Sequence, residues 1–227
     1  MHKVFFILLS CCSLVSGFAQ DSALDSKYLE DQFYMGITYN FLLHKPENAT
    51  QRNLSYGLNA GVIKDIPLNL NRNFGVGIGL GYAINSYYTN IYAESTDSDI
   101  VYSVLGSDVS FKRSKFETHL IEMPFEIRWR TSNAVDYKFW RIYAGAKLAY
   151  VVGGRSKFVS EAGKHSFTNT DINKWQYGLT LNFGYNTFNV HVYYALSTLL
   201  DKNAVVLDTG EDLKVAPLRV GFVFYIL

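Results

Sequence analysis

The chain has 227 residues, of which 48% are hydrophobic and 16% aromatic, and its 21 basic and 20 acidic residues give a net charge of +1. This length suits one domain with a complete core or one membrane barrel, and it excludes several domains. The balanced charge argues against nucleic acid as a partner, since phosphate binding needs an excess of Lys and Arg on one surface. The 17 Tyr, 16 Phe and 3 Trp favour strands over helices.

The first residues have the three parts of a secretory signal: Lys3, an apolar run from Val4 to Leu9, and Gly17-Phe18-Ala19 as a small-x-small cleavage site. The predicted division of the chain is a signal peptide at 1–19, a short periplasmic segment at 20–31 and a barrel at 32–227.

Both cysteines, Cys11 and Cys12, lie in the predicted signal. The mature chain is therefore expected to have no disulfide, no thiolate nucleophile and no Cys-ligated metal. A lipoprotein processed before Cys11 is an alternative, because Leu8-Leu9-Ser10 precedes it. That processing would shorten the apolar region to about six residues, below the usual ~7–15.

Two stretches without Asp, Glu, Lys or Arg, at 73–93 and 175–200, are long enough to be tested as transmembrane helices. The first alternates apolar residues with glycine between Phe74 and Tyr82, a period of two that a helix would distribute around all its faces. The second has polar residues at regular intervals and an Asn-containing turn at its middle. Both stretches are therefore predicted to be strands or hairpins.

Eight segments alternate between a large apolar face and a small or polar face. They are 33–41, 56–62, 74–84, 121–130, 140–150, 175–185, 188–197 and 218–226.

The connections between these segments alternate in length. The short connections are 67–73, 132–138 and 186–187, and the longer, polar ones are 44–54, 88–115, 153–173 and 201–216. Short turns at one end and long loops at the other are typical of outer-membrane barrels. The sequence thus predicts an all-β protein, an eight-stranded antiparallel up-and-down transmembrane barrel in the outer membrane, with a periplasmic amino terminus and extracellular long loops.

Glycine indicates which face of the barrel is outside, since a soluble barrel also alternates but has its apolar residues inward. All eleven glycines of the predicted strands lie on the polar face. Glycine on a solvent-exposed face would weaken the strands, whereas a narrow lumen that holds long polar side chains needs small residues between them. The apolar face is therefore predicted to contact lipid, with Trp129, Trp140 and Trp175 in an interfacial aromatic belt. A soluble barrel with an aromatic core is the alternative.

Seven charged side chains share the inward phase of the predicted strands. This lumen charge network consists of Glu122, Glu126, Arg128, Arg130, Arg141, Lys147 and Arg219. It could line a conduction path or bind an anionic group. Side chains just fill an eight-stranded barrel, and buried charges persist when they are paired, so a paired plug is the favoured interpretation.

Few residues of the sequence favour catalysis, and neither catalytic residues nor a cofactor is predicted. A lipid-modifying barrel enzyme would need a His with a Ser and a carboxylate at the lipid-facing rim. His119 lies in the outward phase beside Glu117, and His191 lies in the inward phase with Ser197 farther along. The usual metal-ligand spacings are absent from the sequence, and acidic loop segments such as 97–99 are explained by solvated charge as well as by weak Ca²⁺ binding.

Three pieces of the sequence resemble small outer-membrane barrels of the PorT or "porin family" group of the Bacteroidota: the signal with Gln20 following it, the strand 120–125, and the closing strand. The closing strand, with Arg219, Gly221, Phe224 and Ile226, looks like a carboxyl-terminal assembly signal, although Leu227 replaces the usual final Phe. The resemblance spans nearly all of the mature chain and is mostly pattern. It implies insertion by the barrel assembly machinery and a connection with the type IX protein secretion system.

Three functions are compatible with these observations. The favoured one is a non-enzymatic accessory or scaffold subunit of an envelope complex, which the resemblance suggests to be type IX secretion. The alternatives are a stand-alone barrel for envelope structure or adhesion and a lipid-modifying enzyme. The expected partners are outer-membrane lipid, the assembly machinery and other outer-membrane proteins of a secretion or envelope complex.

Overall fold

A computed structural model describes residues 31–69, 72–97, 99–131, 139–185 and 188–226. The predicted signal peptide and nearly all of the predicted periplasmic segment lie outside these ranges. Eleven strands are present in the described part: β1 (Asp31–Leu43), β2 (Tyr56–Pro67), β3 (Phe74–Tyr88), β4 (Ile91–Ser95), β5 (Ile100–Val104), β6 (Arg113–Arg130), β7 (Trp140–Val159), β8 (Lys164–Thr168), β9 (Trp175–Tyr185), β10 (Phe188–Ala195) and β11 (Ala216–Ile226).

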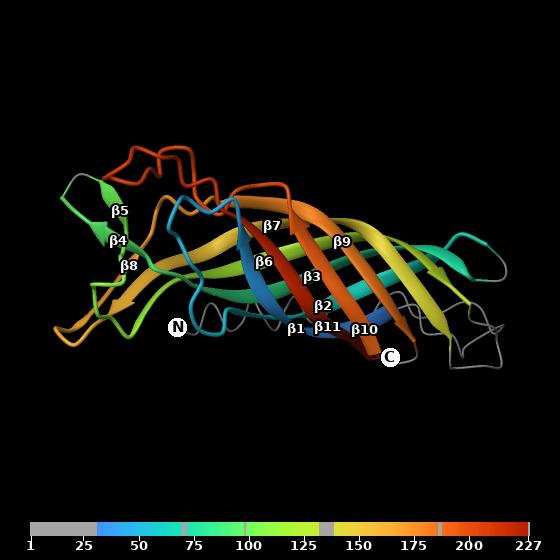
Figure 1. The fold of residues 1–227 in the computed structure, drawn as a ribbon. Helices are drawn as coiled ribbons and strands as arrows, with labels where there is room; N and C mark the ends of the chain where they lie inside the picture. Colours follow the sequence, from blue (N-terminus) through green and yellow to red (C-terminus); the bar gives the residue numbers. More distant parts are fainter. Residues whose placement is uncertain (1–30, 70–71, 98, 132–138, 186–187, 227) are drawn as a thin grey trace, which may run out of the picture.

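Eight of these strands form the closed antiparallel barrel that the alternation predicts. Each pairs with its neighbour in the order β1-β2-β3-β6-β7-β9-β10-β11, and β11 pairs with β1 to close the sheet. The closing register runs from Phe33 opposite Ile226 to Leu43 opposite Ala216. Figure 1 shows the strands wrapping obliquely around one axis, with β1, β11 and β10 side by side. Among the described residues, no helix is long and apolar enough to span a bilayer.

The outward face of the barrel is an apolar belt, as the glycine argument predicts. Phe33 is 62% exposed and Ile127 57%, whereas the inward neighbours Tyr34 and Arg128 are 5% and 0% exposed. A large exposed apolar surface is unusual for a soluble monomer and is expected where the surrounding solvent is lipid.

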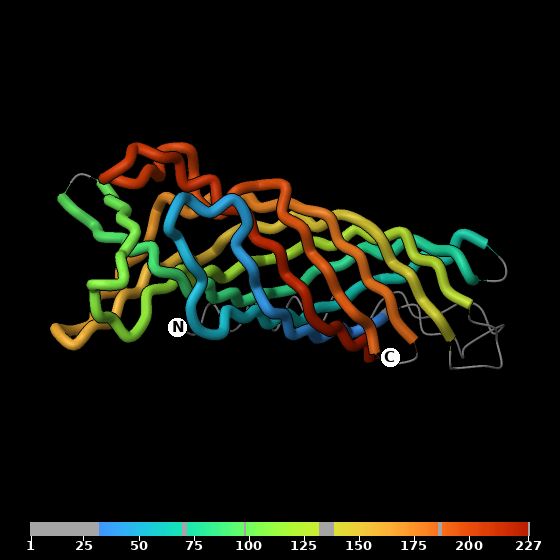
Figure 2. Tube along the Cα trace, in the orientation of Figure 1, coloured from blue at the N-terminus to red at the C-terminus, as the bar shows by residue number. Residues whose placement is uncertain are grey.

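The long connections gather at one end of the barrel, where they form what we call the loop cap: residues 44–55, the described part of 89–112, residues 160–174 and 196–215, and the outer ends of β6 and β7. Figure 2 traces these connections at the end opposite to the described parts of the short turns. Within the cap, β4 and β5 pair as a separate two-stranded sheet, and β8 pairs with the end of β7.

The barrel strands extend into the cap farther than their sequence pattern predicted. The predicted loop 153–173 is wrong in its first part, because β7 continues to Val159 and includes Gly153 and Gly154. The pairing of β6 with β7 shifts register between His119 and Leu120, and a β-bulge of this kind bends a strand and changes which side chains face outward. Gly153 then lies opposite His119 on the outward face. It therefore differs from the eleven glycines of the predicted strands, which were all predicted on the inward face.

Lumen glycines provide the space that larger side chains fill. A Cβ atom on Gly77 would lie 2.5 Å from Nε and 2.9 Å from Cζ of Arg128. Arg128 has no exposed surface and is held by Glu126 and Gln32. The guanidinium therefore cannot move aside without loss of its partners.

Gly77→Val is expected to destabilise the barrel by about 1–3 kcal/mol because it overpacks this contact. Urea unfolding of the refolded barrel, followed by tryptophan fluorescence and heat-modifiable gel migration, measures the change. Ala60→Val on the exposed face of the neighbouring strand is the matched control and should leave the unfolding midpoint unchanged. Equal midpoints for Gly77→Val and the wild type would contradict the packed lumen.

Candidate functional site: a filled lumen and a packed loop cap

The seven charged residues of the predicted network all lie in the barrel lumen, with side chains between 0% and 6% exposed. They occupy inward positions on β6, β7 and β11 because the side chains of a strand alternate between its two faces. The ion pairs and hydrogen bonds among the described residues divide them into two groups, one near the middle of the barrel and one toward the short turns.

Glu122 is the centre of the first group. Its two carboxylate oxygens accept from Lys147 Nζ at 2.9 Å and from Arg219 Nη1 at 3.3 Å. Arg219 also donates to the Tyr87 hydroxyl at 3.2 Å and lies 4.6 Å from the centroid of the Tyr193 ring. The one negative charge of Glu122 thus balances part of the positive charge of these two buried cations, and the aromatic rings stabilise the positive charge that is left.

Asp65 and Glu126 are the acids of the second group. Arg128 forms an ion pair with Glu126 at 2.9 Å and lies 3.7 Å from Asp65, which also binds Arg130. The guanidinium of Arg128 lies 4.5 Å from the centroid of the Tyr143 ring. Buried charges arranged in this way satisfy one another inside the barrel rather than through bulk water.

Arg141 belongs to the second group through aromatic contacts. Its guanidinium lies 4.5 Å from the ring centroid of Phe139 and 5.8 Å from that of Tyr225. The described, buried lumen residues include five cations against three carboxylates. Tyrosine rings therefore take over part of the role that carboxylates have elsewhere in the lumen.

Asp65 is absent from the predicted lumen charge network, although it continues the inward phase of the second predicted strand. That strand was predicted to end at residue 62, whereas β2 continues to Pro67. The inward tyrosines were assigned to the polar face without a role. The cation excess of the seven-residue network was the signal that further acids or aromatic rings had to be present.

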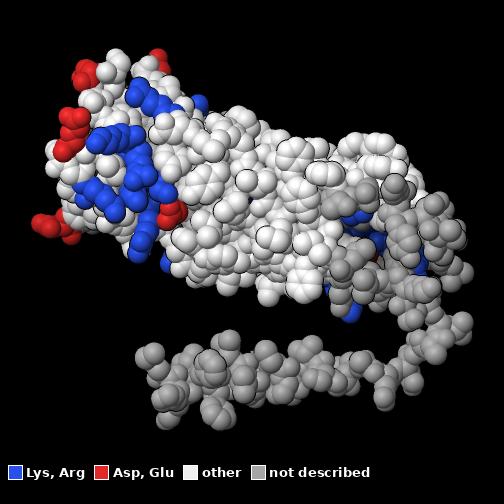
Figure 3. All heavy atoms as spheres, turned by 90° about the horizontal axis from the view of Figure 1, so that it is seen from below, with Lys and Arg blue, Asp and Glu red and all other residues white. Residues whose placement is uncertain are grey.

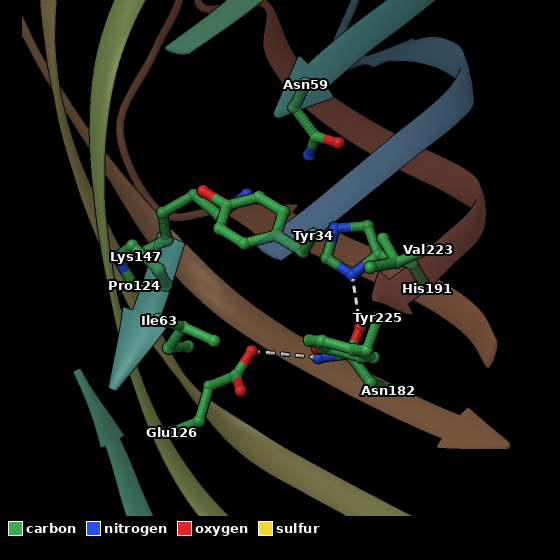
Figure 4. A pocket seen from close by; sticks show the side chains of 10 residues that line it. All are labelled: Tyr34, Asn59, Ile63, Pro124, Glu126, Lys147, Asn182, His191, Val223 and Tyr225. Carbon is green, nitrogen blue, oxygen red and sulfur yellow. Dashed lines mark hydrogen bonds between the residues drawn. The ribbon is translucent and has the colours of Figure 1, made fainter. Parts of the chain in front are cut away.

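A small polar cavity lies beside the two charge groups, and Figure 4 shows the Tyr34 side chain extending across it with its hydroxyl on the side away from His191. Asn182 donates to Glu126 Oε1 at 3.0 Å and contacts His191 Nδ1 at 2.5 Å. The cavity measures about 20 Å³ and a second lumen cavity about 10 Å³, which is space for about one water molecule each. His191 is thus a packed lumen residue, and Ser197 instead contacts the backbone N–H of Tyr177.

His119 lies at the outer edge of the apolar belt, where the sequence placed it. Its Nδ1 is 2.7 Å from the Tyr82 hydroxyl, and its Nε2 is 3.7 Å from Glu117 Oε1. The sequence predicted the neighbouring carboxylate but missed Tyr82, which the β3–β6 pairing brings beside His119. A hydrolytic triad has serine on Nε2 and the carboxylate on Nδ1, whereas here a tyrosine hydroxyl contacts Nδ1 and the carboxylate lies nearest Nε2.

The three tryptophans lie at the two ends of the belt, each 42–54% exposed. Trp129 and Trp140 flank the connection from β6 to β7 at the short-turn end, and Trp175 lies opposite Tyr150 at the cap end. In β11, Arg219 is a lumen residue, Gly221 pairs with Thr38, Phe224 packs on Phe188 with ring centroids 5.6 Å apart, and Ile226 is exposed. These four residues therefore lie along the closing strand.

The loop cap has its own hydrophobic core. Tyr102, Phe116, Leu199, Leu200 and Val215 are each no more than 1% exposed and belong to one buried cluster. They come from β5, β6 and the connection between β10 and β11, so segments distant in the sequence pack as one unit.

Tyr102 is the polar anchor of this cap core. Asn169 donates to its hydroxyl at 3.0 Å, and the hydroxyl donates to Asp171 Oδ2 at 3.0 Å. Burial raises the pKa of Tyr102, and burial together with the carboxylates of Asp201 and Asp99 raises the pKa of Asp171. The backbone of Tyr102 also accepts from Leu207 N at 2.8 Å, which joins the last long connection to the β4–β5 hairpin.

Comparison with known proteins supports the fold. A family model described as "Outer membrane protein beta-barrel domain" matches residues 18–201. The chain belongs to this outer-membrane barrel family. No curated protein matches the sequence.

Two solved structures similar to this outer-membrane barrel are of Ail, the attachment invasion locus protein of Yersinia pestis. The first is 15% identical with a TM-score of 0.37, and the second, a complex with the heparin analogue sucrose octasulfate, is 16% identical with a TM-score of 0.34. Both cover 86% of this chain and 97% of theirs. At this distance the likeness says nothing about what the present barrel binds.

Glu122→Gln is expected to destabilise the barrel by about 3–5 kcal/mol, because it leaves Lys147 and Arg219 buried beside a neutral group. Urea unfolding in detergent measures the loss. The control is Asp212→Asn, which breaks the exposed pair with Lys214 and should leave the unfolding midpoint unchanged. A wild-type midpoint for Glu122→Gln would show that this carboxylate does not hold the lumen cations.

Proposed function

We propose that this outer-membrane barrel is a non-enzymatic scaffold subunit of an envelope complex, which anchors the loop cap in the membrane and presents it to partner proteins. The packed core of the cap is the observation that carries the proposal. This buried cluster joins four connections, to which Ala49, Tyr102, Ile172 and Leu199 belong. Loops that only connect strands have no need of such a cluster. A cap with its own core keeps its surface in a defined shape, which is what a docking partner requires.

The contents of the lumen favour a scaffold over a pore. Every barrel strand contributes a side chain to the lumen, and the charges meet one another at 2.9–3.7 Å rather than line a wide passage. Eight-stranded barrels are narrow enough for side chains to fill. We therefore interpret the network as a plug that makes the barrel rigid.

The cap also exposes apolar side chains away from the belt. Leu54 is 67% exposed in the connection after β1, and Leu207 is 68% exposed in the connection after β10. Exposed apolar residues in a folded cap are suited to contact with another protein.

The orientation that we propose has the amino terminus in the periplasm and the loop cap outside the cell, as the short-turn and long-loop pattern of outer-membrane barrels suggests. We propose further that the complex is the type IX protein secretion machinery, which rests on the resemblance to PorT-type barrels. The barrel assembly machinery and outer-membrane lipid are the remaining proposed partners.

Copurification tests the scaffold proposal. A tagged barrel extracted from gently solubilised outer membrane is expected to retain a stoichiometric partner, and Leu54→Asp with Leu207→Asp should release it by disrupting the apolar contact. Asn203→Asp, also on the exposed cap, is the control and should keep the partner. Heat-modifiable migration verifies that each variant remains folded.

The absence of any stoichiometric partner from the wild-type barrel would contradict the scaffold proposal and favour a stand-alone envelope or adhesion barrel. Retention of the partner by the double variant would mean that the partner docks on a different surface. Mass spectrometry of the retained protein identifies whether it is a secretion component.

Lipid modification remains the alternative activity, and the contact of His119 with Tyr82 and Glu117 is the observation in its favour. On the scaffold proposal, His119→Ala and His191→Ala leave the lipid A composition of the cells unchanged, because neither residue acts on substrate. Mass spectrometry of extracted lipid A, compared with a deletion strain, gives the result. A changed acyl pattern in both the deletion strain and His119→Ala would establish the enzyme instead.

A further inference from the structure

A group of positively charged side chains occupies the outward face of β6, β7 and β8 just beyond the apolar belt. We call it the basic rim, and it consists of Arg113, Lys115, Arg155, Lys157 and Lys164. Glu117 is the one carboxylate among the described outward residues of this part of the sheet.

The charges of the basic rim are not balanced within the sheet. Lys115 and Lys157 lie directly opposite each other in the β6–β7 register, and like charges in that position destabilise a sheet. Lys115 is paired with Glu117 and Ser86. For Arg155, Lys157 and Lys164, the described residues supply no carboxylate within the 4.0 Å of an ion pair. An external anion would relieve the repulsion among them.

A groove runs along the basic rim. It has a volume of about 340 Å³ and is lined by three cations, Arg155, Lys157 and Lys164, by the hydroxyls of Ser166 and Thr168, and by Phe167 and the carboxylate of Glu117, which pairs with Lys115. Arg, Lys and hydroxyl groups are the donors that bind phosphate oxygens. The groove therefore has the chemistry of a site for a phosphorylated group.

The basic rim lies at the height of lipid headgroups. Val152 is the last exposed apolar residue of β7, at 52% exposed, and Arg155 follows three residues later. At ~3.4 Å per residue and a tilt of about 40°, Arg155 lies roughly 8 Å beyond the belt, which is close to the headgroup layer of a bilayer. Longer side chains such as Lys157 can reach back toward that layer.

The distribution of charge over the cap agrees with this position. In Figure 3, the Lys and Arg atoms gather next to the uncharged belt, and the Asp and Glu atoms lie mostly farther out toward the tip of the cap. Cations beside the membrane and anions away from it are the arrangement expected at an anionic membrane surface.

We propose that the basic rim binds the phosphate groups of the phosphorylated glycolipid, lipid A, in the outer leaflet of the outer membrane. The inference rests on the proposed orientation, since the cap must face the leaflet that contains this lipid. Arg155, Lys157 and Lys164 contact the phosphates, and Ser166 and Thr168 add hydrogen bonds. The lipid then neutralises the rim and fixes the height and tilt of the cap above the membrane.

Native mass spectrometry of the purified barrel in detergent tests the proposal, with bisphosphorylated lipid A, dephosphorylated lipid A and inorganic phosphate as probes. The wild type is expected to retain bisphosphorylated lipid A and lose it as salt is raised. The variant Arg155→Ser with Lys157→Ser and Lys164→Ser should weaken retention by about tenfold or more, given three lost cations near an anionic surface. The control removes Lys45, Lys202 and Lys214, also to serine, and should retain the lipid as the wild type does.

Each contrary outcome is distinct. Equal retention by the rim variant and the wild type, or equal retention of dephosphorylated lipid A, would overturn the proposal. Displacement of the lipid by inorganic phosphate at equal concentration would mean a site for free phosphate. Loss of a copurifying protein by the rim variant with unchanged lipid retention would make the rim a protein-docking surface.

The orientation is tested separately by Ser166→Cys and an impermeant maleimide on intact cells. Labelling of intact cells is expected when the groove faces outward. Labelling of lysed cells but not of intact cells would contradict the orientation. Copurification that finds no partner would overturn the scaffold proposal and leave the lipid result intact. The two proposals can thus fail independently.

Discussion

Closure of the sheet between β1 and β11 is the constraint on which the rest of the molecule depends. In a bilayer, backbone N–H and C=O groups find no water, so a spanning sheet must leave no edge. The register from Phe33–Ile226 to Leu43–Ala216 provides that closure. With only eight strands around the ring, the interior is narrow, and every inward residue must fit beside its neighbours across the lumen.

The narrow interior explains the composition of the lumen. Charged side chains there are too far from bulk water to remain unpaired, and Glu122 and Asp65 each contact two cations. Tyrosine rings stabilise the cations that the carboxylates do not match. Glycine on facing strands leaves room for these long side chains, so the small and the charged residues of the polar face depend on each other.

The loop cap is packed differently from the barrel, because it extends beyond the apolar belt. Its core has the composition of a soluble protein, with Phe116 and Leu199 buried and a buried tyrosine held by polar groups. The bulge at His119 marks the change from barrel to cap. Beyond it, the outward face of the same sheet changes from apolar to basic, which separates a surface suited to lipid tails from one suited to lipid phosphates.

Local alternation in the sequence determined the barrel, because a period of two maps directly onto the two faces of a strand. It was sufficient to predict the eight strands, their inward and outward faces, the end with short turns and the end with long loops, and the inward position of Glu122 and Arg128. It did not determine which charges meet. The deciding contacts join residues 37 or more positions apart in the sequence. They are the ion pairs of Asp65 with Arg130 and of Arg219 with Glu122, the contact of Tyr82 with His119, and the hydrogen bond of Tyr102 in the cap core. The basic rim likewise exists only after the bulge and the β7–β8 pairing bring its cations to one face. Such contacts depend on strand register and long-range packing, which no local pattern encodes.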